Sequence, residues 1–307
     1  MLSKVDIQKE LGKGICVFPL DLENIKENSI NLCTGNFAWS MSKREVFFSE
    51  SEKDKNRRFS LTKDSKHSNS VTIEKGKSAI VEGKDGSRYI VVLPLSTTLI
   101  ETKEVLALSS NIGGTYHSKV GLVSKGLGHI GTMVGPNFSG DSLIAIHNTS
   151  NHLIVLSVGE SFVSVVFYYL QTPCPDSNPT TSGHTDKFST LGLEVSEAQL
   201  RELNQDWKKQ YKEVQKRMCQ SKEFRKLQED LRSQKWKSFK KFFRIRNLII
   251  MLVAVIMLVA LYALAYYLDT KDGQTVWVER YFSVGFSGIF VAIITILWNE
   301  LKNNSQS

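Results

Sequence analysis

The chain has 307 residues, of which 41% are hydrophobic and 23% charged, and its formal net charge is +8. This length suits one or two domains, and such a charge is found in nucleic-acid-binding proteins. The segment Ser196 to Arg246 alone holds 16 Lys and Arg against 7 Asp and Glu, a net of +9, so the basicity belongs to that segment and a nucleic-acid-binding role for the whole chain is not favoured.

The four cysteines are Cys16, Cys33, Cys174 and Cys219, and none lies in a C-x-x-C pair. Neither a disulfide framework nor a zinc site is therefore predicted, and reduced thiols in the cytoplasm are the plain interpretation. The polar start MLSKVDIQKELGKG lacks the apolar core of a signal peptide. No cofactor and no metal are expected.

Residues 1–173 consist of short β-patterned runs separated by Gly, Asn, Asp and Ser. Several stretches form an ordered series, which reads MLSKVDI, SINLCTGN, LPLSTTLIETKEVLALSSNIGG, KVGLVSKGL, GPNFSGDSLIAIHNTS and GESFVSVVFYYL. The series resembles the motifs M-L-S-x-x-D-I, S-x-D-L-x-L-G-N, R-S-S-L-A-R-x-G-L and G-x-x-I-A-Q-L-x-F of bacterial dCTP deaminases, members of the dUTPase-like fold. The resemblance implies a β-rich, distorted jelly-roll domain, so the expected fold class of the chain is α+β with its helices towards the C-terminus.

The chemistry of this family needs a carboxylate that activates water, together with basic and hydroxyl groups that hold a triphosphate. The resemblance places the dUTPase aspartate at Gly135 and the deaminase glutamate at Ala145. The two arginines of R-S-S-L-A-R correspond to Lys119 and Ser124, and the glutamine of G-x-x-I-A-Q-L corresponds to Ser164. Loss of a general base typically lowers a rate by about 10²- to 10⁴-fold, so no catalytic residue is predicted.

A scaffold that has lost its base but keeps basic and polar groups is suited to binding rather than turnover. The candidate ligand-binding residues are Lys119, Ser124, Lys125, Asn137, Asp141 and Ser164. The alternative is that the register is wrong and that a carboxylate such as Asp141 or Asp186 enters the site. The chain would then be a membrane-anchored dNTP hydrolase or deaminase.

Residues 174–195 are rich in Pro, Ser and Thr and are predicted to form a linker. The S-x-x-Q capping box from Ser196 to Gln199 then predicts the start of an amphipathic, basic connector helix over residues 196–246. Apolar residues recur in it at steps of three and four, at Leu200, Leu203, Trp207, Tyr211, Val214 and Met218. This stripe could pack on the β-domain of its own chain or on other copies as a short coiled coil.

Residues 247–268, NLIIMLVAVIMLVALYALAYYL, carry no charge and as a helix would be about 33 Å long, which matches the hydrocarbon core of a bilayer. With a second apolar run over residues 281–298 they predict a transmembrane hairpin of two spans over residues 247–298. Basic residues gather in KWKSFKKFFRIR, residues 235–246. By the positive-inside rule, the N-terminal domain and the tail, residues 299–307, are expected on the cytoplasmic side of a bacterial inner membrane.

The first functional hypothesis is a membrane effector in which an inactive nucleotide-binding domain gates a two-span pore. The expected assembly is a homo-oligomer, a trimer or a tetramer, and the expected ligand is a nucleotide or an oligodeoxynucleotide. The layout resembles Hailong-type anti-phage effectors, which implies that a partner nucleotidyltransferase makes the signal. The second hypothesis is the membrane-anchored dNTP hydrolase or deaminase, and a third treats the β-domain as an oligomerisation platform that binds no nucleotide.

Overall fold

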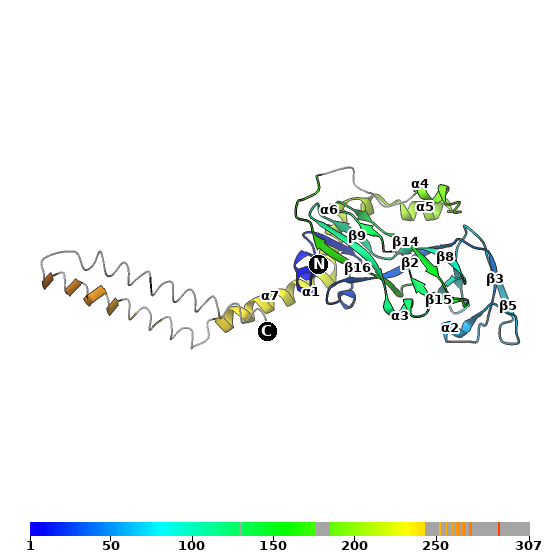
Figure 1. Cartoon of the computed structure of the whole chain (residues 1–307), viewed down its shortest axis with the longest axis horizontal. Coiled ribbons are helices and arrows are strands. Elements are labelled where there is room, and N and C mark those ends of the chain that lie inside the picture. The colour runs from blue at the N-terminus through cyan, green and yellow to red at the C-terminus, as the bar shows by residue number, and fades with distance from the viewer. Residues whose placement is uncertain are drawn as a thin grey trace. The chain divides into compact units, whose positions relative to one another are not determined.

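The computed structural model describes residues 1–128, 131–175 and 185–242, together with the isolated positions 252, 256, 259, 260, 262–264, 266, 267, 270, 271 and 288. The chain divides into two compact units, residues 1–227 and 228–307. Figure 1 shows that the first unit is built mainly of strands, with short helices around them. The β-rich N-terminal domain expected from the sequence is confirmed.

A seven-stranded antiparallel sheet forms the centre of the first unit. Its strands lie in the order β11 (Leu127–Gly128), β14 (Leu143–Asn148), β8 (Ser96–Thr102), β2 (Ile30–Ser40), β16 (Ser161–Tyr169), β10 (Ile112–Ser118) and β12 (Met133–Val134). Burial alternates along β14, where Ile144, Ile146 and Asn148 are buried. This is the period of two that a strand with one covered face requires.

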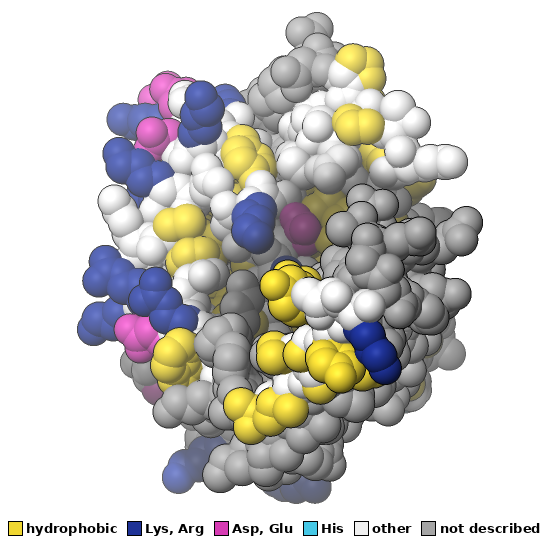
Figure 2. All heavy atoms as spheres, turned by 90° about the vertical axis from the view of Figure 1, so that its left-hand side faces the viewer, with side chains coloured by type: hydrophobic (Ala, Val, Ile, Leu, Met, Phe, Trp, Pro, Cys, Tyr) yellow, Lys and Arg dark blue, Asp and Glu magenta, His cyan; other side chains and the backbone are white. Residues whose placement is uncertain are grey.

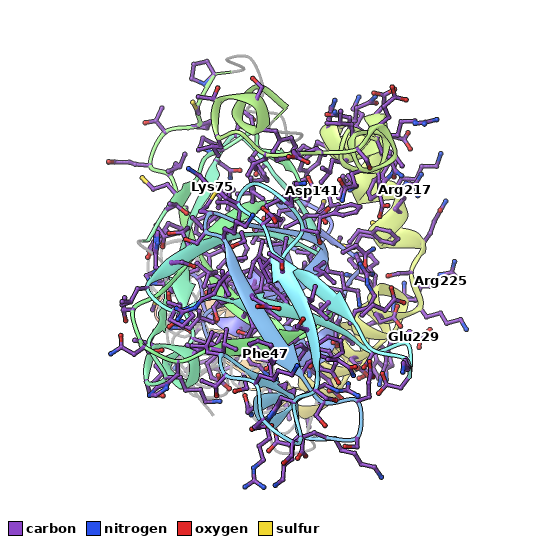
Figure 3. The ribbon with its side chains drawn as sticks, turned by 90° about the vertical axis from the view of Figure 1, so that its right-hand side faces the viewer. Phe47, Lys75, Asp141, Arg217, Arg225 and Glu229 are labelled. Carbon is purple, nitrogen blue, oxygen red and sulfur yellow. The ribbon has the colours of Figure 1, made fainter. Side chains whose placement is uncertain are left out.

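Smaller sheets complete the described part of the unit. Their strands, in sheet order, are β1 (Ile15–Phe18), β9 (Val105–Leu108) and β13 (Ser139–Gly140); β15 (Ile154–Ser157), β7 (Arg88–Val92) and β6 (Ile80–Glu82); and β4 (Phe59–Ser60), β3 (Arg44–Phe48) and β5 (Asn69–Ile73). Figure 3 looks onto the last of these sheets, where Phe47 is labelled. Val46, Phe59 and Ile73 from this sheet share an apolar cluster with Val91 and Val155, so the sheet is anchored to the rest of the unit.

Short helices join the strands, namely α1 (Lys4–Glu10), η1 (Leu22–Asn24), α2 (Lys55–Arg58) and α3 (Val120–Val123). Ser3 and Asp6 form a capping box at the start of α1 and satisfy amide groups that a helix end leaves unpaired. The largest fully buried side chains are Trp39, Phe162 and Phe167. Because large aromatic side chains bury the most apolar area, these three dominate the core.

The C-terminal part of the described chain is helical, with α4 (Thr185–Thr190), α5 (Glu197–Leu203), η2 (Asp206–Lys209), α6 (Tyr211–Gln220) and α7 (Lys222–Phe242). The capping box predicted at Ser196 and Gln199 is confirmed. The single connector helix predicted over residues 196–246 is wrong, because the backbone leaves helical geometry at Gln205 and at Ser221. The Ser221 Oγ accepts the backbone N–H of Phe224 at 3.2 Å, so this residue ends α6 and caps α7.

The predicted linker over residues 174–195 also differs from the structure, since its last part packs on the central sheet. Phe188 is buried, and its ring centroid lies 5.2 Å from that of Trp39. Leu193 joins the same cluster, and the Glu194 N–H donates to the Gly76 carbonyl at 2.8 Å. Burial of Phe188 and Leu193 therefore docks the segment on the sheet, although its composition alone predicts a linker.

The apolar stripe of α6 packs on the β-rich part of its own chain. Val214 and Met218 are fully buried, and the Val17 N–H on β1 points to the Met218 sulfur at 3.2 Å. The Gln215 side-chain amide donates to the Gly12 carbonyl at 2.7 Å. Of the two arrangements that the sequence left open, packing on the same chain is the one found for this segment.

The opposite side of α6 and the start of α7 is basic. Exposed side chains there are Lys212, Lys216, Arg217, Lys222, Arg225 and Lys226. Figure 2 shows Lys and Arg side chains gathered along one side of the face that it draws, and Figure 3 labels Arg217 and Arg225. In the part of the chain that the structure describes, no ion pair involves these residues, so their charge is available to an anionic partner.

The predicted spans, residues 247–268 and 281–298, and the tail, residues 299–307, fall outside the described residues apart from isolated positions. Among the residues that are described, no helix combines the length and the apolar character needed to cross a bilayer. The transmembrane hairpin and its orientation therefore stay predictions.

Replacement of Phe188 by alanine tests whether residues 185–195 belong to the folded unit. We expect Phe188→Ala to lower the free energy of unfolding by about 3 kcal/mol, because loss of a buried aromatic side chain leaves a cavity. Leu191→Ala is the matched control, since that side chain in the same segment is 39% exposed and its loss should cost less than about 0.5 kcal/mol. Denaturant unfolding of the full-length chain measures both, and equal effects would contradict the docked segment.

Candidate functional site

Lys119 and Ser164 meet on one polar strip of the central sheet. Lys119 is half-buried between β10 and α3, and its Nζ donates to the Ser161 Oγ on β16 at 3.0 Å. The Ser164 Oγ donates to the Asn31 Oδ1 on β2 at 2.7 Å. A β-bulge after Ser161 interrupts the alternation of side chains, which allows the two serines to share a face. The polar strip of Lys119, Ser161, Ser164 and Asn31 thus sets a cation beside hydroxyl and amide groups.

Ser124 and Lys125 lie on the loop that follows α3, and both are exposed. The Ser124 Oγ donates to the Gly121 carbonyl at 3.3 Å, and Gly126 turns the chain with a φ of +91°, a conformation that favours glycine. Beside the loop lies a cavity of about 300 Å³ lined by Ser118, Val123, Gly126, Leu127, Gly128, His147 and Thr149. The stretch that resembles the phosphate motif of the family therefore borders a small, mainly apolar hollow.

Asn137 and Asp141 lie on the other side of β12, next to β13. Asn137 has a φ of +60°, and its side-chain nitrogen is buried without a hydrogen-bond partner. Asp141 is buried and accepts from the Lys208 Nζ at 2.7 Å. Within the described residues, Asp141 pairs with Lys208, and no hydrogen bond or ion pair joins Asn137 or Asp141 to the polar strip.

The two positions where the resemblance places catalytic carboxylates differ in their surroundings. A side chain added at Gly135 would meet no atom within 4 Å at its Cβ. Ala145 on β14 packs instead against an apolar cluster that includes Trp39, Phe188 and Leu193. The position at which the resemblance places the deaminase glutamate is therefore half-buried against residues of the chain's own segment 188–203.

A buried ionic cluster, which the sequence analysis did not single out, joins the connector to the central sheet. Lys208 on η2 lies 2.7 Å from Asp141 and 3.7 Å from Glu101 on β8, and its carbonyl accepts from the Ser139 Oγ at 2.7 Å. Burial, and then the hydrogen bond with Asp141, raise the pKa of Glu101 to about 9. Among the described residues, no group of three His, Cys, Asp or Glu side chains is arranged to hold a metal ion.

The sequence held one signal of this cluster. Glu101 follows Leu99 and Ile100 in the strand STTLIET, where an unpaired charge facing the core would be unfavourable. Its partner Lys208 could not be found in the same way, because it lies in a segment with many other lysines.

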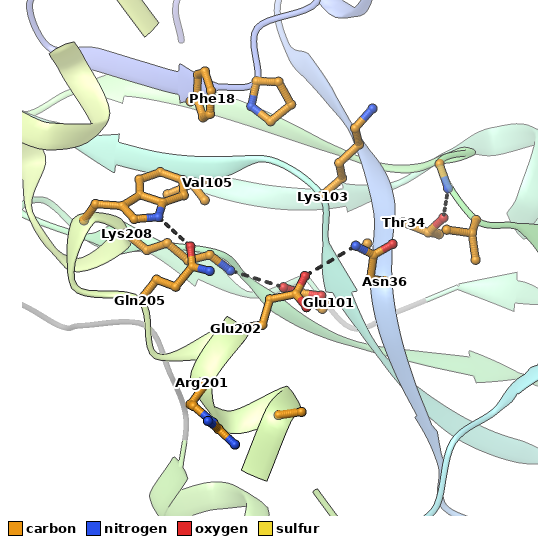
Figure 4. Close-up of a pocket in the computed structure, with 16 residues that line it drawn as sticks. Phe18, Thr34, Asn36, Glu101, Lys103, Val105, Arg201, Glu202, Gln205 and Lys208 are labelled. Carbon is orange, nitrogen blue, oxygen red and sulfur yellow. Dashed lines mark hydrogen bonds and ion pairs between the residues drawn. The ribbon is translucent and has the colours of Figure 1, made fainter. Parts of the chain in front are cut away.

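A cavity of about 660 Å³ adjoins the ionic cluster (Figure 4). The β-rich part contributes Phe18, Pro19, Thr34, Gly35, Asn36, Glu101, Lys103, Val105, Val158 and Gly159, and the connector contributes Ala198, Arg201, Glu202, Gln205, Trp207 and Lys208. Its walls are thus shared between β1, β2, β8 and the α5–η2 segment. A ligand in this cavity would contact both the β-rich part and the α5–η2 segment.

Comparison with known proteins decides the family. Residues 1–170 match the family model described as dCTP deaminase-like. The chain belongs to this family. The resemblance drawn from its sequence motifs is therefore confirmed at the level of the family, with the match restricted to the β-rich part of the chain.

Relatives of known function are distant. The dCTP deaminase of Thermococcus gammatolerans is 30% identical over 102 residues, which are 32% of this chain and 65% of the relative. That of Caldivirga maquilingensis is 33% identical over 88 residues, 29% of this chain and 48% of the relative. A solved dCTP deaminase from Agrobacterium tumefaciens aligns with a TM-score of 0.36 at 15% identity, over 54% of this chain and 46% of that one.

The raised pKa of Glu101 predicts a dependence of stability on pH. The folded protein holds this proton up to about pH 9, whereas the unfolded chain releases it near pH 4.5, the ordinary value for the group. The contribution of Glu101 to stability is therefore fully present below pH 4.5 and is lost as the pH rises through 9. We expect the free energy of unfolding to fall over this window and Glu101→Gln to flatten the fall.

Urea unfolding at a series of pH values measures the effect. Glu194→Gln is the control, because Glu194 is exposed and its replacement should leave the slope with pH unchanged. A Glu101→Gln profile parallel to that of the wild type would show that the Glu101 carboxyl is ionised in the folded chain.

Proposed function

We propose that the dCTP deaminase-like domain binds a nucleotide or an oligodeoxynucleotide and leaves it intact. The observation that carries the proposal is the environment of Ala145. The resemblance places the deaminase glutamate there, and the position packs against Trp39, Phe188 and Leu193. An apolar cluster supplies no carboxylate to activate the water that the reaction needs.

The loss of the base is large enough to decide between turnover and binding. A missing general base costs about 10²- to 10⁴-fold in rate, or on the order of 3 to 5 kcal/mol of barrier. Asp141 does not replace the base missing at Ala145, because its carboxylate already accepts from the Lys208 Nζ at 2.7 Å. Asp186, the other carboxylate considered, has a side chain outside the described residues.

The polar strip supports binding of an anionic ligand. Lys119 has its Nζ beside the Ser161 hydroxyl, and Ser164 lies further along the same strand. An ammonium holds phosphate as a point charge rather than through the two-pronged geometry of arginine. Lys125 is exposed on the adjoining loop. These groups suit a phosphate-bearing ligand without requiring that it react.

We propose further that the ligand state acts on the C-terminal apolar runs. The α6 helix is fastened to β1 through Val214 and Met218, and η2 is fastened through Lys208. A ligand that favours one arrangement of the β-rich part by a few kcal/mol would therefore also bias the helices that lead to residues 247–298.

The wider role in this proposal is that of a membrane effector in anti-phage defence. The effector would be a homo-oligomer, a trimer or a tetramer, with the family domain in the bacterial cytoplasm and residues 247–298 forming the pore. A partner nucleotidyltransferase would supply the signal. The second candidate, a membrane-anchored deaminase or dNTP hydrolase, is favoured by the name dCTP deaminase that the relatives carry.

Binding and turnover assays on the full-length chain separate the two candidates. We expect dCTP, dUTP and short oligodeoxynucleotides to give no turnover and at least one of them to bind saturably. Lys119→Gln should weaken binding about tenfold, because it removes a charge-assisted contact to phosphate. Lys63→Gln, which removes an exposed lysine outside the polar strip, is the control.

Turnover by the unmodified chain would support the second candidate, the deaminase or dNTP hydrolase. Gly135→Asp sharpens the comparison, since the structure has space for the Cβ there, whereas Ala145→Glu would place a carboxylate in an apolar cluster. Robust turnover by Gly135→Asp alone would show that the remaining groups still form an active site.

Membrane depolarisation tests the effector role. In bacteria that carry the chain with its neighbouring genes, we expect phage challenge to collapse the membrane potential, as read by a potential-sensitive dye. Deletion of residues 247–307 should abolish the effect, because the apolar runs predicted to span the bilayer are removed. A membrane potential that stays intact through phage challenge would count against a pore.

A further inference from the structure

The positive charge of the first unit is concentrated at its C-terminal end. Residues 1–210 hold 23 Lys and Arg against 23 Asp and Glu, so the formal charges of this part cancel. Residues 211–227 add six Lys and Arg against two Asp and Glu. The six are exposed and form the basic face, which consists of Lys212, Lys216, Arg217, Lys222, Arg225 and Lys226. Charge of one sign that gathers on one surface attracts a partner of the opposite charge.

Helical periodicity turns the basic face away from the strands. On α6, Val214 and Met218 are fully buried. Lys212 and Lys216 each lie two residues before one of them, which is about 200° around the helix. In Figure 3 the Arg225 side chain lies on the side of α7 away from the strands. The packing that docks α6 on β1 therefore also fixes the direction in which the basic face points.

Contacts within the chain do not neutralise the basic face. Glu213 is half-buried and Glu223 is exposed, and among the described residues neither forms an ion pair with a Lys or Arg of this face. The Arg217 guanidinium lies 4.3 Å from the centroid of the Trp207 ring, a contact that leaves its positive charge in place. The face thus presents a net positive charge to its surroundings.

The sequence that follows the basic face favours a lipid surface as its partner. Residues 231–246 hold seven Lys and Arg and no Asp or Glu, with four aromatic residues among them. Trp236, one of these four, is 59% exposed. Basic and aromatic side chains together suit the headgroup region of an anionic leaflet. The uncharged residues 247–268 come directly afterwards.

We propose that the basic face binds anionic phospholipid headgroups and that α7 lies along the membrane surface. The inference rests on the membrane location in the proposed function. Helix α7 has 21 residues, so an α7 perpendicular to the membrane would hold Lys222 about 30 Å from the level of residue 242. Electrostatic attraction is screened within roughly 8 to 10 Å at physiological salt. Only an α7 parallel to the surface lets residues 212–226 and 231–246 contact the same leaflet.

Lipid binding would add a second constraint to α6. Val214 and Met218 hold one side of this helix on the β-rich part of the chain. A membrane that binds the other side would therefore hold the β-rich part close to the bilayer. The contact involves neither the polar strip nor a nucleotide, so lipid composition would set the position of the connector independently of any ligand.

Hydrogen exchange of the full-length chain on vesicles tests the contact. One preparation contains phosphatidylcholine alone, and the other contains phosphatidylcholine with the anionic phosphatidylglycerol. We expect exchange at residues 211–227 to slow severalfold on the anionic vesicles only, whereas residues 44–48 should exchange equally on both. The slowing should disappear when salt is raised from about 0.1 M to 1 M, because the Debye length falls. Equal exchange at residues 211–227 on the two preparations would overturn the proposal.

A double charge reversal locates the contact on the basic face. Lys216→Glu with Arg225→Glu should remove the slowing, because each cation near an anionic surface contributes to binding. Both side chains are exposed, so the thermal midpoint should stay unchanged. Lys63→Glu with Lys75→Glu is the matched control, since it changes the net charge equally at exposed positions elsewhere. Slowing that persists in the first variant would contradict the proposal.

A milder variant guards against a folding defect in the reversal. Lys216→Gln with Arg225→Gln only neutralises the two charges, and it should reduce the slowing by less than the reversal does. An unreduced slowing in this folded variant would count against the basic face.

Flotation separates this inference from the proposed pore. A chain whose apolar runs enter the bilayer floats with both kinds of vesicle. A chain held by the basic face alone floats only with the anionic vesicles and is released by about 1 M salt. The slowed exchange supports the basic face in either case. Duplex DNA of mixed sequence is the competing partner, and slowing by DNA without slowing by anionic vesicles would show that the face binds nucleic acid instead.

Discussion

The buried ammonium of Lys208 fixes the relation between the β-rich part of the chain and the helices that follow it. An ammonium taken out of water is strongly unfavourable unless carboxylates compensate it. Here the Asp141 carboxylate lies 2.7 Å and the Glu101 carboxyl 3.7 Å from the Lys208 Nζ. The Ser139 hydroxyl donates to the backbone carbonyl of Lys208. Lys208 lies in η2, between α5 and α6. The cluster therefore determines where both helices run.

Two regions of the central sheet differ because of this docking. With η2 held in place, the segment from Phe188 to Leu203 covers the Ala145 side of β14 with apolar side chains. The polar strip around Lys119 and Ser164 keeps half-buried polar groups instead. The first region presents apolar side chains, and the second presents a lysine ammonium with hydroxyl and amide groups. This contrast is the physical basis for proposing a binding domain within a family whose named relatives are deaminases.

The cavity beside Lys208 follows from the same cluster. The α5–η2 segment is held by Lys208 and by the burial of Leu203, and it leaves a hollow between Glu202 and the strands, into which Glu101 also faces. Burial, and then the neighbouring Asp141 carboxyl, keep Glu101 protonated up to about pH 9.

The sequence determined much of this protein by local rules. Ordered motifs over residues 1–173 identified the family, and S-x-x-Q predicted the start of α5. The stripe of α6 predicted a buried face, and the resemblance placed Gly135 and Ala145 where relatives carry carboxylates. Each of these depends on residues close together in the chain or on motif order.

Only the tertiary structure decided which distant groups meet. It broke the expected connector helix at Gln205 and Ser221, docked Phe188 on Trp39, and brought Lys208 to Glu101 and Asp141. It also paired Asp141, one of the candidate ligand-binding residues, with Lys208. Such contacts join positions far apart in the sequence, and their free energy arises from burial and from charge pairing in a low-dielectric interior. Local sequence patterns do not predict that burial, so the docking of the connector could not be predicted from the sequence alone.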